Sequence, residues 1–149
     1  GIRTSLDAGP ITWGELFTIQ PFGNAVVSMD LTGVSLLRAL EQQWSDPAHV
    51  HMLQVSGLRY TYDPLKPVGA RVTSVEVAGA LLSPTATYRV ATNNFLSEGG
   101  SGFSALTEGK NMRVGAIDLD VLVAYIEALG KPVTASVEGR FRAVSAGSR

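Results

Sequence analysis

The order of apolar and polar residues along the chain predicts three helices. Thr12 and Glu15 form a capping box, in which each side chain bonds the backbone N–H of the other residue at the start of a helix. Thr32 is expected to cap the second helix. Gly130 is expected to end the third, because glycine readily adopts the left-handed conformation that follows many helices. The helices are expected at residues 12–17, 32–46 and 118–130.

The second and third helices are amphipathic. Their apolar positions recur at helical spacing: Val34, Leu37, Ala39, Leu40 and Trp44 in the second, and Leu119, Leu122, Val123, Ile126 and Leu129 in the third. The opposite, polar face of the second helix carries Arg38, Glu41 and Gln42. Trp13 and Trp44 each lie in a helix with apolar neighbours, so both are predicted to be packing residues. Asp46-Pro47 is expected to end the second helix.

Segments that are rich in β-branched residues or alternate in polarity predict the strands. They are residues 25–31, 52–55, 58–62, 71–78, 81–82, 87–92 and a final strand within 133–141. Gly79 is expected to make a tight turn between two of them. Strands outnumber helices and follow one another in an irregular order. The pattern therefore favours an α+β domain, with a mixed sheet and flanking helices, over a doubly wound sheet.

Length and composition describe one globular domain. The chain has 149 residues, of which 45% are hydrophobic and 17% charged, with a net charge of −1. A protein that binds nucleic acid through bulk charge would be more basic, so no nucleic-acid partner is expected. No apolar run approaches the roughly 20 residues that span a bilayer. The absence of cysteine excludes disulfides, thiolate metal sites and cysteine nucleophiles.

The ends of the chain indicate a domain taken from a larger protein. Gly1-Ile2-Arg3 followed by turn residues is typical of the end of a strand that begins upstream. Residues 1–144 are expected to form the domain, truncated at its N-terminus, and residues 145–149 a frayed tail.

Two polar motifs have residue types that catalytic or metal sites use. His49 and His51 would point to one face of a strand and could supply two metal ligands. The chain has no other His or Cys to complete such a site, and the alternative is a pair of solvated loop histidines. Ser101 is flanked by Gly100 and Gly102, yet it lies in neither a nucleophile elbow nor a dinucleotide fingerprint. No catalytic residue and no metal ligand is therefore predicted.

Two loops place a phenylalanine beside turn-forming residues. Phe22 lies in Pro21-Phe22-Gly23-Asn24, and Phe95 lies in Asn93-Asn94-Phe95-Leu96, ahead of Gly99-Gly100. Two such rings could sandwich a planar base, worth about 1–3 kcal/mol for each stacked base. The alternative is that each ring fills the core beneath its turn. Arg3, at the end of the first segment, could bind a phosphate bidentately or could be an ordinary surface arginine.

These segments, in their order and spacing, resemble the C-terminal domain of the 5′-nucleotidase family from Gly1 to about Phe103. The segments that carry the resemblance are Gly1-Ile2-Arg3, residues 11–17 leading to 21–24, residues 53–63, residues 88–96, and Gly99-Gly100 with Gly102-Phe103. Residues 137–140 are similar to the family's closing strand.

The resemblance implies a substrate-binding domain that works with an N-terminal metallophosphoesterase domain carrying two divalent metal ions. It implies that Phe22 and Phe95 clamp the nucleobase of a nucleotide or nucleoside and that Arg3 holds the substrate and its phosphate. Asn94, Gly100 and Ser101 complete the implied substrate-binding set. It also implies that the C-terminal domain rotates toward the metals and that the protein is secreted, periplasmic or attached to the cell surface.

Ser101 departs from the family pattern. An acidic residue usually stands there and binds the ribose hydroxyls, and a serine cannot accept hydrogen bonds as an ionised carboxylate does. The expected function is nonetheless the specificity domain of a metallophosphohydrolase that removes phosphate from nucleotides or sugar nucleotides, inactive as this chain alone. The alternative is a non-catalytic domain that binds a nucleoside or another small ligand, or a surface interaction domain whose site has decayed.

Overall fold

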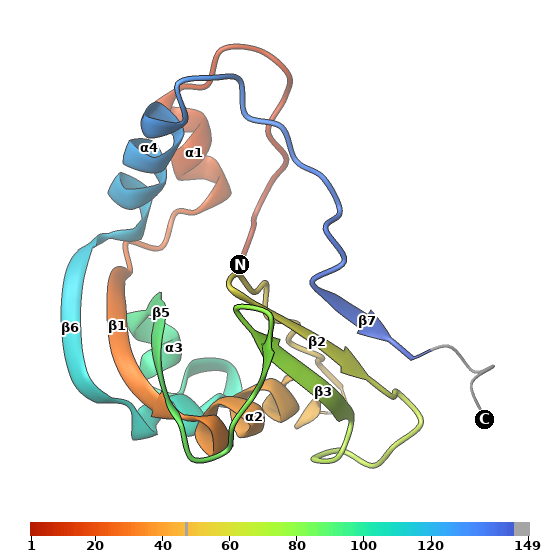
Figure 1. Ribbon diagram of the computed structural model, residues 1–149. Coiled ribbons are helices and arrows are strands. Elements are labelled where there is room, and N and C mark those ends of the chain that lie inside the picture. The colour runs from red at the N-terminus through yellow and green to blue at the C-terminus, as the bar shows by residue number, and fades with distance from the viewer. Residues whose placement is uncertain (47, 145–149) are drawn as a thin grey trace.

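A computed structural model describes residues 1–46 and 48–144 (Figure 1). Pro47 and the predicted tail at 145–149 lie outside the described residues. The helices are α1 (Trp13–Ile19), α2 (Gly33–Glu41), α3 (Asn94–Ser97) and α4 (Asp118–Leu129), with 3₁₀ turns η1 (Gln42–Trp44), η2 (Gly100–Gly102) and η3 (Ser104–Glu108). The strands are β1 (Ala25–Thr32), β2 (Leu58–Tyr62), β3 (Val72–Val77), β4 (Ala80–Leu81), β5 (Thr87–Asn93), β6 (Lys110–Ile117) and β7 (Phe141–Ala143).

The strands form two sheets, and the predicted α+β class is confirmed. The first sheet is antiparallel with strand order β5-β1-β6. The second has the order β4-β3-β2-β7 and is mixed, because β7 runs parallel to β2. Figure 1 shows α2 across the foot of both sheets and α1 beside α4 at the far end of the first. No helix in the described ranges is long and apolar enough to cross a bilayer.

Local sequence signals account for the starts of α1 and α2 and for the end of α4. Helix α2 ends at Glu41, before the predicted Asp46-Pro47, because the chain tightens into the 3₁₀ turn η1 from Gln42 to Trp44. Both halves of the predicted capping box are present at Thr12 and Glu15, and α1 continues two residues beyond its expected end. The side chain of Thr32 accepts a hydrogen bond from the Ser35 N–H at the start of α2. Gly130 follows α4 with φ +59°, the left-handed conformation that its position predicts.

Three strand predictions differ from the structure. Residues 52–55 form no strand, because the Leu53 N–H bonds the Gln43 side chain instead of a neighbouring strand. The final strand is Phe141–Ala143, which shares only Phe141 with the predicted 133–141, and residues 133–140 form no strand. The apolar pattern gives no indication of β6, all of whose residues are exposed and whose pairing with β1 contains two irregularities. A strand without a buried face lacks the period-two signal.

Trp13 is not a core residue, which corrects its predicted role. It is 57% exposed and stacks on Phe17, four residues later, with ring centroids 5.3 Å apart. Helix α1 is only seven residues long and buries Leu16 alone, so the outward-facing rings cover one another instead of the core. Trp44 is buried, as predicted.

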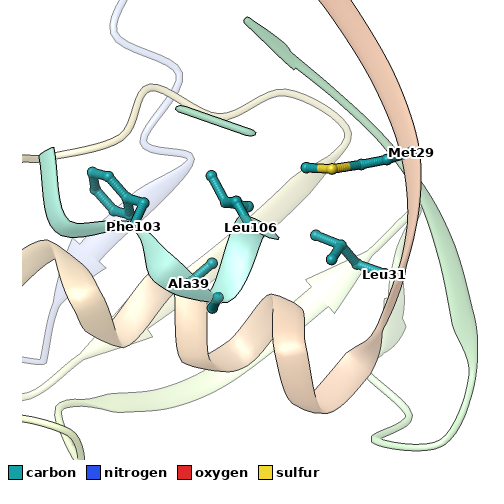
Figure 2. Packing of buried hydrophobic residues seen from close by; sticks show 6 residues of the cluster. Met29, Leu31, Ala39, Phe103 and Leu106 are labelled. Atoms are coloured by element: carbon teal, nitrogen blue, oxygen red, sulfur yellow. The ribbon is translucent and has the colours of Figure 1, made fainter. Parts of the chain in front are cut away.

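Helix α2 separates two hydrophobic cores. On one side, Ala39 joins residues of the first sheet and of the segment after α3 (Figure 2). That cluster is Met29, Leu31, Ala39, Phe103, Ala105 and Leu106. On the other side, Leu40 and Trp44 pack against Tyr60 and Val75 of the second sheet. Since one short helix supplies side chains to both cores, it determines where the two sheets stand relative to one another.

Gln43 connects α2 to the second sheet. Its side chain is fully buried, and its Oε1 accepts hydrogen bonds from the Leu53 N–H (2.8 Å) and the Tyr60 hydroxyl (3.0 Å). Its Nε2 donates to the Leu40 carbonyl at 2.7 Å. Burial raises the pKa of Tyr60, and the hydrogen bond to Gln43 opposes part of that rise. The tyrosine therefore stays neutral as the hydrogen-bond donor to the amide.

Glu41 is buried, although the helical pattern assigns it to the polar face of α2. Its two carboxylate oxygens accept the N–H groups of Arg71 (3.0 Å) and Val72 (2.6 Å), where β3 begins. The carboxylate thereby satisfies both backbone donors at the start of β3. Burial of a charged residue is favourable here because its hydrogen-bonding capacity is used.

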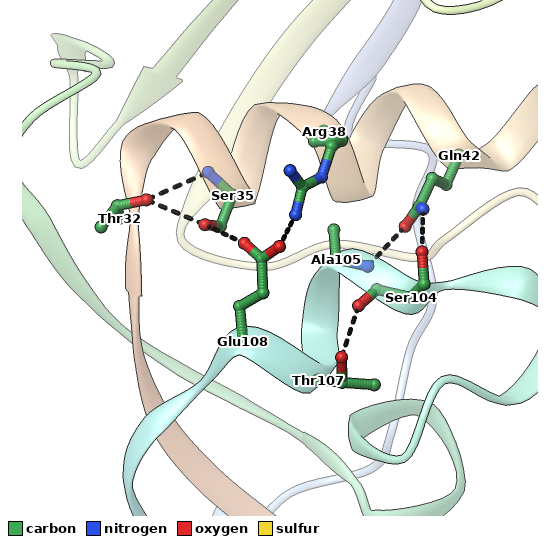
Figure 3. Close-up of polar contacts among 8 residues, drawn as sticks. All are labelled: Thr32, Ser35, Arg38, Gln42, Ser104, Ala105, Thr107 and Glu108. Carbon is green, nitrogen blue, oxygen red and sulfur yellow. Dashed lines mark hydrogen bonds and ion pairs between the residues drawn. The ribbon is translucent and has the colours of Figure 1, made fainter.

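The polar residues of α2 also bind η3 (Figure 3). Gln42 accepts the Ala105 N–H at 2.9 Å and donates to the Ser104 hydroxyl at 2.7 Å. Arg38 forms an ion pair with Glu108, whose other oxygen accepts the Ser35 hydroxyl at 2.7 Å. The segment that follows α3 is thereby attached along the whole length of α2.

A polar network holds β6 against the other strands of the first sheet. Asp30 accepts hydrogen bonds from Arg89 (3.0 Å) and from the side chain of Asn111 (2.7 Å). The Arg89 guanidinium also donates to the Asn111 carbonyl and the Ser28 hydroxyl. The hydrogen bond from Asn111, followed by that from Arg89, lowers the pKa of the Asp30 carboxyl.

Replacing Gln43 tests its role as a buried connector. In Gln43→Ala the Tyr60 hydroxyl and the Leu53 N–H lose their shared acceptor and a cavity forms. We expect the free energy of unfolding to fall by about 2–4 kcal/mol in urea denaturation. The matched control is Gln54→Ala, an exposed glutamine, whose effect should stay within about 0.5 kcal/mol. Equal stabilities for the two variants would contradict the role assigned to Gln43.

Acid titration tests the Asp30 network. A carboxyl whose pKa is lowered by folding stabilises the protein above its unfolded pKa of about 4 and loses that contribution as the pH falls. We expect Asp30→Asn to be less stable than the parent at pH 7, and the difference measured in denaturation curves to shrink as the pH falls below about 4 and through the lowered pKa of the folded state. Asp7→Asn, in an exposed loop, is the control and should follow the parent at every pH.

Candidate functional site

Phe22 lies on the loop between α1 and β1, with its ring 41% exposed. Gly23 follows it with φ +61°, a conformation that reverses the chain and that larger residues rarely adopt. The Arg3 guanidinium lies 5.0 Å from the centre of the Phe22 ring, a cation–π arrangement. The backbone N–H of Arg3 donates to the Ile19 carbonyl at the end of α1 (2.9 Å). The structure therefore brings Arg3 and Phe22 together, two of the residues predicted to bind substrate.

Phe95 lies in the first turn of α3, directly after β5, and its side chain is 50% exposed. The Asn93 side chain caps this helix by accepting the Leu96 N–H at 2.9 Å. Leu96, next to Phe95, packs against the first core instead. Neither Phe22 nor Phe95 is buried, so the alternative that each ring fills the core beneath its turn does not describe this structure.

Asn94 joins the two loops. Its side-chain oxygen accepts the Ala25 N–H at 2.9 Å, although 69 residues separate them in the sequence. Phe22 is three residues before Ala25, and Phe95 directly follows Asn94. The hydrogen bond therefore places the bases of both loops side by side at one end of the first sheet. The same hydrogen bond uses the side-chain oxygen of Asn94. The predicted contact of Asn94 with substrate would therefore be made by its amide nitrogen.

Gly100 leaves room for the Phe95 ring. A Cβ atom on Gly100 would lie 2.5 Å from the Phe95 carbonyl oxygen and 2.6 Å from two ring carbons. Such distances are far below van der Waals contact. Glycine is therefore required at this position by the close approach of the ring, and Gly100 positions Phe95.

Ser101 adopts a left-handed conformation, with φ +54° and ψ +25°, between Gly100 and Gly102. This conformation costs a residue other than glycine, asparagine or aspartate about 1–2 kcal/mol. Its side chain is exposed, and no hydrogen bond from its hydroxyl is found within residues 1–46 and 48–144. An acidic residue would tolerate this backbone better, so the serine differs from the family pattern in conformational preference as well as in charge.

The histidines lie apart from these loops. His49 and His51 are both exposed, and the Nδ1 atom of His49 is 3.2 Å from the Asp46 carboxylate. In the part of the chain that the structure describes, no three His, Asp or Glu side chains converge in a way that could hold a metal ion.

The side chains of Arg3, Phe22, Phe95 and Ser101 are exposed. A groove of about 640 Å³ lies instead between the outer face of α2 and the β2–β3 connection, lined by Val34, Leu37, Arg38 and Val68 among others. The sequence indicated Phe22, Phe95 and Arg3. It did not indicate the hydrogen bond from Ala25 to Asn94, because these residues are distant along the chain. It did not indicate the contact between Gly100 and Phe95 either, because that contact depends on how the loop folds back.

The chain belongs to the 5′-nucleotidase C-terminal domain family, whose model matches residues 1–108. It is 39% identical, over 97% of its length, to an apyrase of Tabanus yao, and 37% identical over 97% to the trifunctional nucleotide phosphoesterase protein YfkN of Bacillus subtilis. The crystal structure of a 5′-nucleotidase precursor from Thermus thermophilus superposes with a TM-score of 0.87 at 44% identity, over 97% of this chain.

The chain matches only part of each relative. It spans 28% of the apyrase, 10% of YfkN and 30% of the Thermus protein. The family resemblance found in the sequence is therefore confirmed at the level of this C-terminal domain.

Substituting Gly100 tests whether it positions Phe95. Gly100→Ala should lower the free energy of unfolding by about 1–3 kcal/mol, because the methyl group meets the Phe95 carbonyl as well as the ring. The control is Gly14→Ala, which meets no atom within 4 Å and lies in α1, where alanine should stabilise by about 0.5–1 kcal/mol. Thermal denaturation and the chemical shifts of the Phe95 ring protons measure both effects. Unchanged ring shifts in Gly100→Ala would contradict the contact.

Proposed function

We propose that this chain is the substrate-specificity domain of a 5′-nucleotidase-like metallophosphohydrolase that removes phosphate from nucleotides or sugar nucleotides. The observation that carries the proposal is the pair of exposed phenylalanines on loops joined by the Ala25–Asn94 hydrogen bond. A large ring left half in solvent at the end of a sheet is available to a ligand. Membership in the family supports the same assignment.

In this proposal the two rings bind the base and Arg3 binds the phosphate. Each base presents a flat π-face, so stacking tolerates different bases and gives broad nucleotide recognition. The Arg3 guanidinium lies over the Phe22 ring. From there its N–H groups can donate to two oxygens of a phosphate in a bidentate contact. Ser101 offers one hydroxyl at the edge of this surface, which is a weaker partner for ribose than a carboxylate.

Catalysis would require groups that these residues do not supply. The donor set of the described residues does not fit a pair of divalent metal ions, because its carboxylates and histidines do not converge. We therefore assign the metals to an N-terminal metallophosphoesterase domain and derive no catalytic step within this chain. The proposal also includes a nucleotide ligand, an N-terminal domain that carries the metals, and a secreted, periplasmic or cell-surface location. The domain boundary at residue 144 belongs to it as well.

Binding of adenosine tests the clamp. We expect Phe22→Ala and Phe95→Ala each to weaken adenosine binding by about 1–3 kcal/mol, measured by NMR titration, with the fold retained because both rings are partly exposed. Phe17→Ala is the matched control: Phe17 is similarly exposed on α1, outside the proposed site, and its loss should leave the affinity unchanged. Adenosine affinity equal to the parent's in both loop variants, or a shift pattern that avoids both loops, would overturn the clamp.

A further inference from the structure

The outer face of the second sheet gathers three arginines. Tyr60 pairs with Phe141 across β2 and β7, and their rings stack toward the core with centroids 5.6 Å apart. Side chains alternate between the faces of a strand, so the neighbours of these two residues point outward. The outward residues are Arg59 and Thr61 on β2, Arg140 just before β7, and Arg142 on β7. We call this set, with Ser74 of β3, the arginine face.

The charges of the arginine face are only partly balanced. Glu138 bonds Arg140 through both carboxylate oxygens, each at 3.0 Å. Arg59 donates instead to the backbone carbonyls of Glu138 and Gly139, which are neutral acceptors. Glu76 is opposite Arg59 on β3, yet the structure shows no ion pair for Arg59 or Arg142 within the described ranges.

Like charges on neighbouring strand positions destabilise a sheet. The face nevertheless places Arg59 beside Arg140, whose carbonyl accepts the Tyr60 N–H, and places Arg142 opposite Thr61. An anion bound between the guanidinium groups would offset this repulsion. The face offers the guanidinium N–H groups of Arg59 and Arg142 and the hydroxyl of Ser74. The Thr61 hydroxyl is hydrogen-bonded to Thr73 (2.7 Å), and Glu76 adds one carboxylate to the lining.

The surface is hollowed at this place. A cavity of about 70 Å³ is lined by Arg59, Thr61, Ser74, Arg140 and Arg142 among others. It shares Arg59, Glu76 and Arg140 with a groove of about 370 Å³ that continues toward Ser56 and Gly79. The small cavity is suited to a single charged group, and the groove has room for what is attached to it.

We propose that the arginine face binds a phosphate group, either as inorganic phosphate or as the phosphate of a small ester that extends into the groove. Guanidinium groups match phosphate oxygens bidentately, and a doubly charged anion gains more from several arginines than a singly charged one. The site is separate from the proposed nucleotide site. Phe22 and Phe95 border the first sheet, whereas the residues of the arginine face lie on strands of the second sheet or, for Arg140, directly before one.

Titration with inorganic phosphate at constant ionic strength tests this site, followed by amide NMR shifts of the 149-residue chain. We expect saturable shifts at Thr61, Ser74 and Arg142, and a loss of affinity of about tenfold or more in Arg59→Gln/Arg142→Gln. The matched control is Arg113→Gln, which removes an exposed arginine of β6 and should leave the affinity unchanged. A parallel titration with glycerol phosphate should add shifts at Ser56 and Gly79 if esters use the groove, and shifts confined to the cavity would assign the site to inorganic phosphate.

Two results would overturn the proposal: no saturable shift on the second sheet up to about 50 mM phosphate, or equal affinities in the double variant and the Arg113 control. Phosphate could also bind Arg3, so the titration is repeated with Arg3→Gln, which should keep the shifts of the second sheet. Because adenosine carries no charge, its binding at Phe22 and Phe95 reports on the nucleotide proposal separately. Either proposal can therefore fail while the other stands.

Discussion

Three consecutive polar residues, at the point where α2 passes into η1, connect the parts of this domain. Glu41 accepts two backbone N–H groups where β3 begins, Gln42 bonds η3, and Gln43 bonds Tyr60 of β2 and the N–H of Leu53. Helical geometry rotates successive side chains by about 100°, so neighbouring residues point to different sides of the helix. These three residues thereby reach two strands of the second sheet, the segment at Leu53, and η3, whose Ala105 and Leu106 belong to the core of the first sheet. Each of these contacts is buried or partly buried, and removing one partner would leave the other unsatisfied.

The candidate nucleotide site depends on the first sheet and on the attachment of η3 to α2. Antiparallel pairing of β1 with β5 brings the loop before β1 next to the helix after β5, and the Ala25–Asn94 hydrogen bond joins them there. Gly100 then folds back against Phe95, and Phe103, directly after η2, anchors the loop in the first core. The exposed rings are thus held by buried neighbours, which is the arrangement that a rigid binding surface requires.

The arginine face is held differently from the candidate nucleotide site. It lies on the solvent side of a sheet whose other side is filled by Tyr60, Val75 and Phe141. Its arginines contribute little to packing, and one of the three is neutralised by Glu138. The domain therefore presents two chemically distinct surfaces, one aromatic with a single arginine and one cationic with hydroxyl groups. Each is supported by its own sheet.

Local signals in the sequence determined the starts of α1 and α2, the end of α4, the turn at Gly79 (φ +81°) and five of the strands, because capping residues and glycines act within a few positions of themselves. They also identified both exposed phenylalanines and Arg3. The tertiary structure alone decided that Trp13 is exposed, that Glu41 is buried, and that residues 110–117 form a strand with no buried side. It alone joined Asn94 to Ala25 and set three arginines on one face. These features depend on contacts between segments far apart in the chain, and neither periodicity nor propensity carries information about which distant partner a residue will meet.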